Sequence, residues 1–444
     1  MNRVLKEFIN YVGSNTIGMI ATAICILVDY WFIATAMGTD GLAALSLGLP
    51  IYAITWGLGI MLGVGGGAKY AEYYSIGDAK RANQAFTMTT IVGVLFFLPL
   101  ILAGVFLSGG LAQLVGSEGT LLPMVTGYIR LILLFSPGFM IYNIFESFTR
   151  NDDSPIAAMI SSIIYNVMNI VFDAIFIFGL GLGMNGAALA TGAASICALI
   201  YLVLYWLYKK DTFKFVKTRL RWKEVLSICV IGLPSFNSEF LYGFIHITFN
   251  ITFINLAGNV GAAAFGIVAS LSALSFYMFQ GIGQGIQPLA SYYYGVKERG
   301  NLKRVLKYAL VTCAIFSVLI LGVIFAYTDS ITSLLNTQQD ESLRILANEG
   351  AKIYFIAFPF VGITTIAIAF LSVTSAPKVA LILSVLQNGV LLIPLILLLS
   401  FLFGINGAWS SYAVSEFILV IASIYFIIQA MREKSLKERR EIKP

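Results

Sequence analysis

Long apolar segments separated by short polar loops dominate the pattern of this 444-residue chain. About 20 consecutive apolar residues span a bilayer as an α-helix, because each residue adds about 1.5 Å of length. The pattern predicts twelve such helices, at residues 11–36, 44–68, 84–107, 122–148, 155–179, 185–208, 224–256, 261–292, 303–327, 345–373, 378–402 and 407–430. We therefore expect an all-α polytopic membrane protein.

Composition agrees with this class. Hydrophobic residues make up 59% of the chain, charged residues make up 11%, and the mean hydropathy is +0.87, values far from those of soluble globular domains. The four cysteines fall inside apolar runs and show neither a pairing pattern nor a metal-ligand spacing. We expect them to be small packing residues.

The positive charges predict the orientation. If the N-terminus lies in the cytoplasm, all but three of the 28 lysines and arginines fall in cytoplasmic loops; the three are Arg130, Arg344 and Lys352. Cytoplasmic loops of membrane proteins are enriched in these residues, so both termini are predicted to lie inside. The net charge of +6 is then explained by membrane topology, and no nucleic-acid partner is expected.

The chain also repeats itself at an offset of half its length. "MGTDGLAA" (37–44) recurs as "AGNVGAAA" (257–264), and "GMNGA" (183–187) recurs as "GINGA" (404–408). Ordered matches at one period indicate internal duplication. Each half holds six predicted spans, so the two bundles are related by an axis along the membrane normal and can support alternating access.

This repeat predicts the domain organisation. We expect an N-lobe at residues 1–208, a basic cytoplasmic linker at 209–223, and a C-lobe with a basic tail at 224–444.

Motifs of soluble enzymes are not supported by their context. "GLGMNG" (181–186) satisfies G-x-G-x-x-G but lies in a turn between two membrane spans, without the βαβ unit that dinucleotide binding requires. His246 is the only histidine, and no nucleophile–base set accompanies it. Two roles are open for His246: a packed, hydrogen-bonded residue or a proton carrier. We expect no enzyme and no cofactor.

Acidic residues within the spans are the strongest functional signal, because a charge at bilayer depth costs about 3 kcal/mol. In "NVMNIVFDAIFIFG" (166–179), Asp173 lies about 27 Å along its predicted helix, and Asp29 lies at the same depth in the first span. Glu239 and Glu416 also fall within spans. Two helical stripes lead to the first two acids: Gly18, Thr22, Cys25 and Asp29, and Ser162, Asn166, Asn169 and Asp173.

Thr191 lies at a similar depth in the sixth span. The four side chains of Asp29, Asn169, Asp173 and Thr191 can form a compact chamber that exchanges a proton or holds Na⁺ through oxygen ligands. The structural alternative is a hydrogen-bonded clamp between helices.

Three stretches in both halves carry a family resemblance: "VDYWFIATAMGTDGLAALSLGLPI" (28–51), the run from "RNDDSPIAAM" to "GMNGAALAT" (150–191), and "GQGIQPLASYYYG" (283–295). The whole chain resembles the multidrug and toxic compound extrusion (MATE) family, in its DinF-like/MepA-like branch. The resemblance implies twelve helices in two six-helix lobes, in a prokaryotic-type cytoplasmic membrane. It also implies export of organic cations and other amphipathic compounds against H⁺ or Na⁺.

The resemblance further implies site residues. The cation-coupling residues are Asp29, Asn143, Asn169, Asp173 and Thr191, and all of these except Asn143 are possible Na⁺ ligands. The NorM branch of the family instead uses acids in helices seven and ten. Glu239 lies in helix seven here, but helix ten has no acid, which favours coupling in the N-lobe. As substrate-binding residues we predict Glu239, Tyr30, Trp56 and Gln284.

Two functions remain open. The first is a monomeric, cation-coupled exporter of small amphipathic or cationic substrates. The alternative is a flippase for lipids or lipid-linked oligosaccharides, from the same superfamily. The predicted spans are nearly free of Lys and Arg, which argues against an anionic pyrophosphate cargo. The roles of Glu239, Glu416 and His246, the identity of the substrate and the choice between H⁺ and Na⁺ are left open.

Overall fold

The computed structural model describes the backbone of residues 3–209, 213–335, 341–374 and 376–441. Every regular element in these ranges is a helix. This agrees with the predicted class, because lipid offers the backbone no hydrogen-bond partners and a helix satisfies its own.

The N-terminal half begins with α1, which contains two spans joined across a kink. Its helices are α1 (Arg3–Ser75), α2 (Ala79–Phe106), the short α3 (Ser108–Leu114), α4 (Leu121–Leu134), α5 (Ser136–Asn151), α6 (Pro155–Asp173), the π-helix η1 (Ala174–Gly179) and α7 (Gly183–Tyr208). Helices α4 and α5 meet at an angle of 47° and together form one span.

The C-terminal half follows the same plan. Its helices are α8 (Trp222–Gly295), α9 (Arg299–Leu335), α10 (Glu341–Tyr354), the 3₁₀ turn η2 (Phe355–Ala357), α11 (Phe358–Ser372), α12 (Pro377–Val385), the π-helix η3 (Leu386–Val390) and α13 (Leu392–Glu441). Here α10 and α11 form the bent pair, with an angle of 43°.

The twelve predicted spans are confirmed. Within the described residues, nine helices are long and apolar enough to cross a membrane, and each of the two bent pairs adds one more. The stretch Pro377–Met431 counts among the nine, but it is broken at Gly404 and supplies the twelfth. The side of the membrane on which the ends lie stays a prediction.

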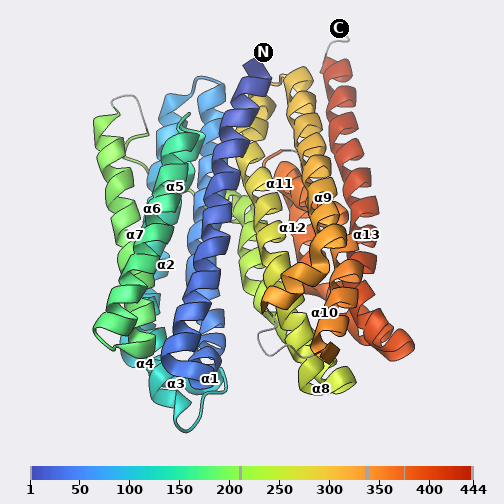
Figure 1. Cartoon of the computed structure of the whole chain (residues 1–444). Helices are drawn as coiled ribbons and strands as arrows, with labels where there is room; N and C mark the ends of the chain where they lie inside the picture. Colours follow the sequence, from blue (N-terminus) through green and yellow to red (C-terminus); the bar gives the residue numbers. More distant parts are fainter. Residues whose placement is uncertain (1–2, 210–212, 336–340, 375, 442–444) are drawn as a thin grey trace.

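The internal duplication is visible in the backbone. Gly38 and Gly258 break α1 and α8 with the same left-handed conformation, φ +61° in both cases. At the second repeated motif, Gly183 begins α7 and Gly404 breaks α13, also with positive φ values of +54° and +60°. Glycine fits these positions because it carries no Cβ. In Figure 1 the two halves lie side by side, blue to green and yellow to red, with both termini at one end.

The two halves touch most closely through glycine. A methyl group on Gly232 of α8 would lie 1.8 Å from the carbonyl oxygen of Met61 in α1. Nearby, Asn15 Nδ2 donates to the Gly281 carbonyl at 3.0 Å, and Ser291 Oγ donates to the Ala68 carbonyl at 2.7 Å. Small residues let helix backbones approach one another in the membrane. The interface between the halves is therefore built on backbone contact.

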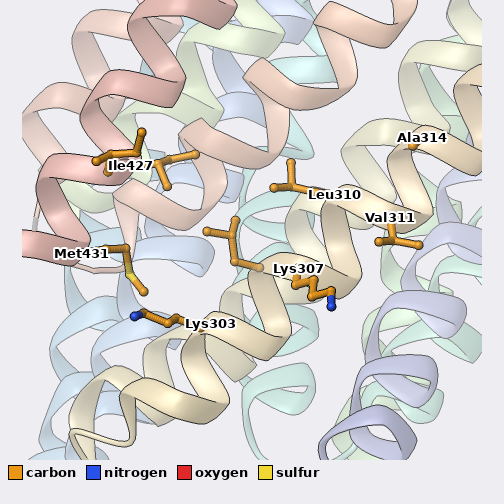
Figure 2. Close-up of a pocket in the computed structure, with 9 residues that line it drawn as sticks. Lys303, Lys307, Leu310, Val311, Ala314, Ile427 and Met431 are labelled. Atoms are coloured by element: carbon orange, nitrogen blue, oxygen red, sulfur yellow. The ribbon is translucent and has the colours of Figure 1, made fainter.

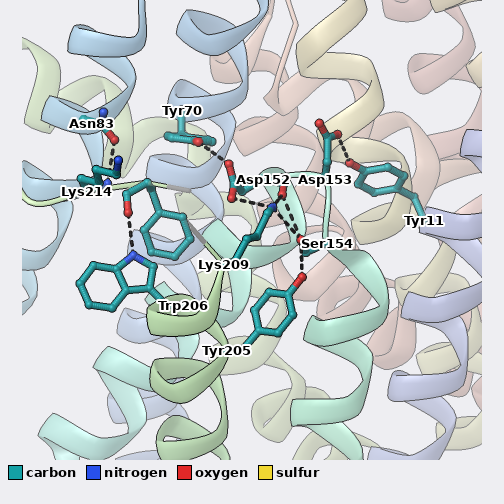
Figure 3. Close-up of polar contacts among 11 residues, drawn as sticks. Tyr11, Tyr70, Asn83, Asp152, Asp153, Ser154, Tyr205, Trp206, Lys209 and Lys214 are labelled. Atoms are coloured by element: carbon teal, nitrogen blue, oxygen red, sulfur yellow. Dashed lines mark hydrogen bonds and ion pairs between the residues drawn. The ribbon is translucent and has the colours of Figure 1, made fainter. Parts of the chain in front are cut away.

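The start of the linker is fixed to the N-terminal half (Figure 3). Trp206 Nε1 donates to the carbonyl of Phe213 at 2.6 Å, and the Phe213 ring is buried against Phe86, 4.5 Å between centroids. Lys209 Nζ lies 2.9 Å from Asp152, which also accepts a hydrogen bond from Tyr70. The division into residues 1–208, 209–223 and 224–444 stays a prediction, but residues 209 and 213 pack with the first half.

An apolar groove lies between α9 and α13 (Figure 2). Lys303 and Lys307 sit among the aliphatic side chains of Leu310, Ile427 and Met431. The groove includes none of the predicted site residues, so it is separate from the candidate site.

Replacement of Gly232 tests the contact between the halves. Gly232→Ala should lower the free energy of unfolding by about 1–3 kcal/mol, because the added methyl group meets a backbone oxygen that cannot turn away. Gly266→Ala is the matched control: it lies in the same helix and has nothing within 4 Å. Thermal unfolding of the purified proteins measures the difference. Equal unfolding temperatures for both variants would contradict the interpretation.

Candidate functional site

The two acids of the N-terminal half come together as predicted. Asp29 lies on α1, and Asp173 is the last residue of α6, with only 2% of its surface exposed. The two carboxyl groups are linked through Cys25 and Asn169, so they lie on the same polar cluster between α1 and α6. Two carboxyl groups this near each other are most stable when one of them carries a proton. The pair is therefore suited to holding one shared proton or a cation.

Cys25 and Asn169 bridge the two acids. The Cys25 thiol donates to Asn169 Oδ1 at 3.0 Å and lies 3.8 Å from Asp29 Oδ1, while Asn169 Nδ2 donates to Asp173 Oδ2 at 3.3 Å. The sequence predicts a packing role for Cys25, and the structure shows a bridging contact instead. The available signal was its place in the same stripe as Asp29.

A second layer of polar contacts lies about one helical turn before Asn169 and Cys25 in the chain. Asn166 Nδ2 donates to Thr22 Oγ1 at 3.1 Å and to the Ser162 carbonyl at 2.8 Å. Within the described part of the chain, Asn166 Oδ1 and Asp173 Oδ1 are buried without a hydrogen-bond partner. These two oxygens give the cluster spare acceptors, which a proton or a metal ion can use.

Local sequence explains why α1 and α6 can bring these groups together. A methyl group on Gly18 would lie 3.3 Å from Ser162 Oγ, so glycine permits the close approach of the helices. Pro155 starts α6, where its missing N–H costs nothing. Directly after Asp173 the helix widens into η1, and π-helical turns of this kind are frequent at functional sites.

Thr191 and Asn143 make different contacts. Thr191 Oγ1 donates to the Ala187 carbonyl at 2.9 Å, and Asn143 Nδ2 donates to the Phe139 carbonyl at 2.8 Å, so each bonds to its own helix. Among the described residues, neither has a hydrogen bond to the two acids. The described residues also hold no group of three or more His, Cys, Asp or Glu that fits a metal ion. Binding of Na⁺ here stays a prediction that depends on amide and hydroxyl oxygens.

Trp56 lies at the centre of an aromatic cluster. Its ring centroid is 5.3 Å from Tyr165, 5.8 Å from Phe139 and 5.9 Å from Tyr52. Aromatic rings at these distances interact favourably and offer flat apolar faces.

Glu239 of the C-terminal half lies next to this cluster. Gly57 directly follows Trp56 in the chain. A methyl group on Gly57 would lie 3.7 Å from the Cβ atom of Glu239. Tyr30 is more open, with 37% of its surface exposed. The structure thus places one acid and one aromatic cluster on facing helices of the two halves.

Gln284 occupies a contact between the halves. Its Oε1 accepts a hydrogen bond from Arg150 Nη1 at 3.2 Å. Arg150 is buried, with 4% of its surface exposed, and also pairs with Glu146. The structure therefore assigns Gln284 a clear structural contact, and a role in substrate binding stays a prediction. The side chain of His246 lies outside the described residues.

Comparison with known families agrees with the duplicated geometry. The family model described as MatE matches residues 15–175 and 234–398, one stretch in each half. The chain belongs to the MatE family. With the spans described above, this MatE protein is a multi-pass membrane protein.

Relatives match over nearly the full length of this MatE protein. The multidrug export protein MepA of Staphylococcus saprophyticus is 26% identical over 441 residues, which cover 99% of this chain and 96% of that protein. MepA of Staphylococcus aureus strain MRSA252 matches with the same identity and coverage.

Solved structures confirm the two-lobe fold. A multidrug resistance MATE family transporter, described as outward-facing, superposes with a TM-score of 0.91 at 19% identity and covers 98% of this chain and 97% of its own. A transporter of the MOP superfamily from Pyrococcus furiosus gives a TM-score of 0.89 at 18% identity, with 97% of both chains covered.

Asn169→Leu tests the polar bridge. The substitution removes the amide that joins Cys25 to Asp173 and should lower the free energy of unfolding by about 1–3 kcal/mol, because it leaves buried polar atoms without partners. Asn250→Leu, at an exposed position of α8, is the control. Thermal unfolding of both purified variants measures the effect, and a loss no larger than that of the control would count against the bridge.

Proposed function

We propose that this MatE protein is a secondary active exporter that exchanges organic cations or amphipathic drugs for H⁺ or Na⁺. It acts as a single chain, without a cofactor and without enzymatic activity. Its relatives over the full length are named as multidrug export proteins, which supports the class of substrate. The observation that supports the coupling is the pair of Asp29, which is half-buried, and Asp173, which is buried.

The acid pair can couple ion movement to a change in shape. Two carboxylates that both carry a charge repel each other strongly where water is scarce. A bound proton or Na⁺ removes this repulsion and lets α1 and α6 approach. No lysine or arginine among the described residues forms an ion pair with either acid, so the mobile ion is the available source of neutralising charge.

The substrate would bind where the two halves face each other. An organic cation finds a carboxylate in Glu239 and aromatic faces in the cluster around Trp56, and both groups attract a positive charge. Tyr30 would extend this surface. A flat aromatic lining accepts ligands of varied shape, which suits an exporter of several drugs.

The contacts between the halves favour one state of the transport cycle. The backbone contact at Gly232 and the hydrogen bonds at Asn15 and Ser291 join the halves on the predicted cytoplasmic side. If that orientation is correct, the described conformation is closed toward the cytoplasm. Rocking of one half against the other would open this contact and let substrate enter.

The function is tested with purified protein in liposomes that contain a cationic fluorescent dye. An outside-acidic pH gradient and an inward Na⁺ gradient are imposed separately, in the direction that drives export. We expect dye efflux under at least one gradient and none without a gradient. Absence of efflux under both, together with movement of labelled phospholipid between leaflets, would replace the exporter by the lipid-flippase alternative.

Neutral variants of the acid pair should block coupling while the fold remains. Asp173→Asn and Asp29→Asn keep the size of the side chain but can no longer release a proton. We expect gradient-driven efflux to be lost in both, with normal membrane insertion and elution as a single species. Glu118→Gln, an exposed acid in a loop, is the control and should transport normally. Normal efflux from either aspartate variant would remove that acid from the coupling site.

Glu239 separates substrate binding from ion coupling. Glu239→Gln should weaken binding of a cationic dye by about tenfold, or about 1.4 kcal/mol, and should leave binding of an uncharged dye nearly unchanged. Fluorescence titration of the purified protein measures both affinities, with Glu349→Gln, an exposed acid of α10, as the control. An equal loss for both dyes would point to a structural or coupling role.

A further inference from the structure

The C-terminal half buries an acid of its own. Glu416 lies on α13 with 0% of its surface exposed. It is twelve residues past the kink at Gly404, or about 18 Å along the helix at the usual rise per residue. None of the ion pairs found among the described residues involves it. A carboxylate at this depth without a positive partner is costly, and such residues usually have a function.

Three elements enclose the Glu416 carboxyl group. Gln387 in η3 donates from Nε2 to both carboxyl oxygens, at 3.1 and 3.2 Å. The hydroxyl of Thr364 on α11 lies alongside the same carboxyl group. This hydroxyl is fully buried and makes no hydrogen bond within the described part of the chain. The pocket thus contains one hydroxyl that can donate to the charged carboxylate of Glu416 or accept a hydrogen bond from its protonated form.

The helix is interrupted beside this acid. Gln387 and Asn388 belong to the π-helix η3, and Asn388 departs from helical geometry with φ −93° and ψ +20°. A π-helical turn replaces the regular i→i−4 hydrogen bonds, and such turns are frequent at functional sites. The partner of Glu416 therefore lies on backbone that can change shape more easily than a regular helix.

A chain of hydrogen bonds leads from this segment to the face between the halves. Asn388 Nδ2 donates to the Ser384 carbonyl at 2.8 Å and to Ser238 Oγ on α8 at 3.4 Å. Ser238 directly precedes Glu239, the acid beside the aromatic cluster of the other half. This hydrogen bond connects η3 to the residue next to the one that we assign to the substrate.

The internal repeat supports the same location. Ser384 and Asn388 correspond to Ser162 and Asn166 at the offset that also relates Pro377 to Pro155. In both halves the asparagine donates to the serine carbonyl four residues earlier, at 2.8 Å. The N-terminal copy adjoins the Asp29–Asp173 pair. The C-terminal copy adjoins Glu416, which comes from a different helix.

We propose that Glu416 is a second proton-binding site, in the C-terminal half, with Gln387 and Thr364 as its hydrogen-bonding partners. This site differs from the acids in the seventh and tenth membrane spans that the NorM branch of the family uses. Of the elements packed against α13, η2, α11 and η3 carry no titratable side chain. Helix α12 carries only Lys378, in its first turn. On α10, Tyr354 stacks on Tyr412 of α13, Arg344 pairs with Glu341, and Glu349 and Lys352 are exposed. On α8, Glu239 directly follows Ser238, which bonds to Asn388 beside Gln387.

The proton step is a simple transfer. The Glu416 carboxylate accepts one proton and becomes a neutral acid whose O–H can donate to Thr364 Oγ1. The protonated oxygen then no longer needs the Gln387 amide, so η3 is released from one of its two bonds. Loss of the proton restores both bonds. A proton is favoured over Na⁺ because the described cage has a single carboxylate, and the amide of Gln387 turns its N–H group, not its oxygen, toward that carboxylate.

Infrared difference spectroscopy tests the site without requiring transport. The C=O stretch of a protonated carboxylic acid is recorded for the full-length protein in lipid while the pH is stepped from 9 to 5. We expect a band that grows as the pH falls, that Glu416→Gln removes, and that Asp173→Asn and Glu349→Gln keep. Glu416→Asp retains the acid and should restore a shifted band, which provides a second variant if the glutamine form folds poorly.

Three results would overturn this proposal. The first is an identical set of bands in the wild type and Glu416→Gln. The second is a Glu416 band that does not change between pH 9 and pH 5, which means that the group never exchanges its proton. The third is suppression of the band by Na⁺ at constant pH, which identifies a sodium site. A role of Glu416 in coupling rests on the proposed export. If the protein shows the pH-dependent Glu416 band but fails to export dye, the proposed export is rejected and the proton-binding site is kept.

Discussion

Lipid offers no hydrogen-bond partners, and this constraint shapes the molecule. Each backbone group in the membrane must be satisfied within the protein, so the described spans are helices. Departures from the regular helix then need polar side chains or close neighbours. The two π-helices illustrate this: η1 follows Asp173, and η3 contains Gln387 and Asn388. The places where the helices deform are thus the places where ionisable chemistry collects.

Duplication supplies one scaffold twice, and the two copies use it differently. The glycine kinks, the bent helix pair and the Ser-x-x-x-Asn contact recur in each half. The acids do not recur. In the first half they come from α1 and α6 and face each other, whereas in the second half Glu416 comes from α13 and faces an amide. Backbone geometry therefore survives in both halves, while the charged groups have moved to different helices.

Sequence predicted the parts that depend on periodicity and depth. The twelve spans follow from apolar run lengths, and the meeting of Asp29 and Asp173 follows from equal depth on two polar stripes. Contacts that depend on helix rotation were not predictable. Glu416 and Gln387 lie 29 residues apart on different helices, and no local pattern joins them. Gln284 faces Arg150 for the same reason, because packing between the halves decides its direction.

The buried ring of Phe213 has a consequence for dividing the chain. The loop after α7 belongs physically to the first half, because this ring fills a space among phenylalanines there and the backbone beyond it bonds to α2 at Asn83 and Thr87. If the two halves were expressed as separate chains divided at residue 209, the apolar space that Phe213 fills would be open to water. A cut after Val216 would keep that space filled. In the uncut chain, residues 217–221 are what remains between this anchored segment and α8, and this short tether limits how far the halves can rock.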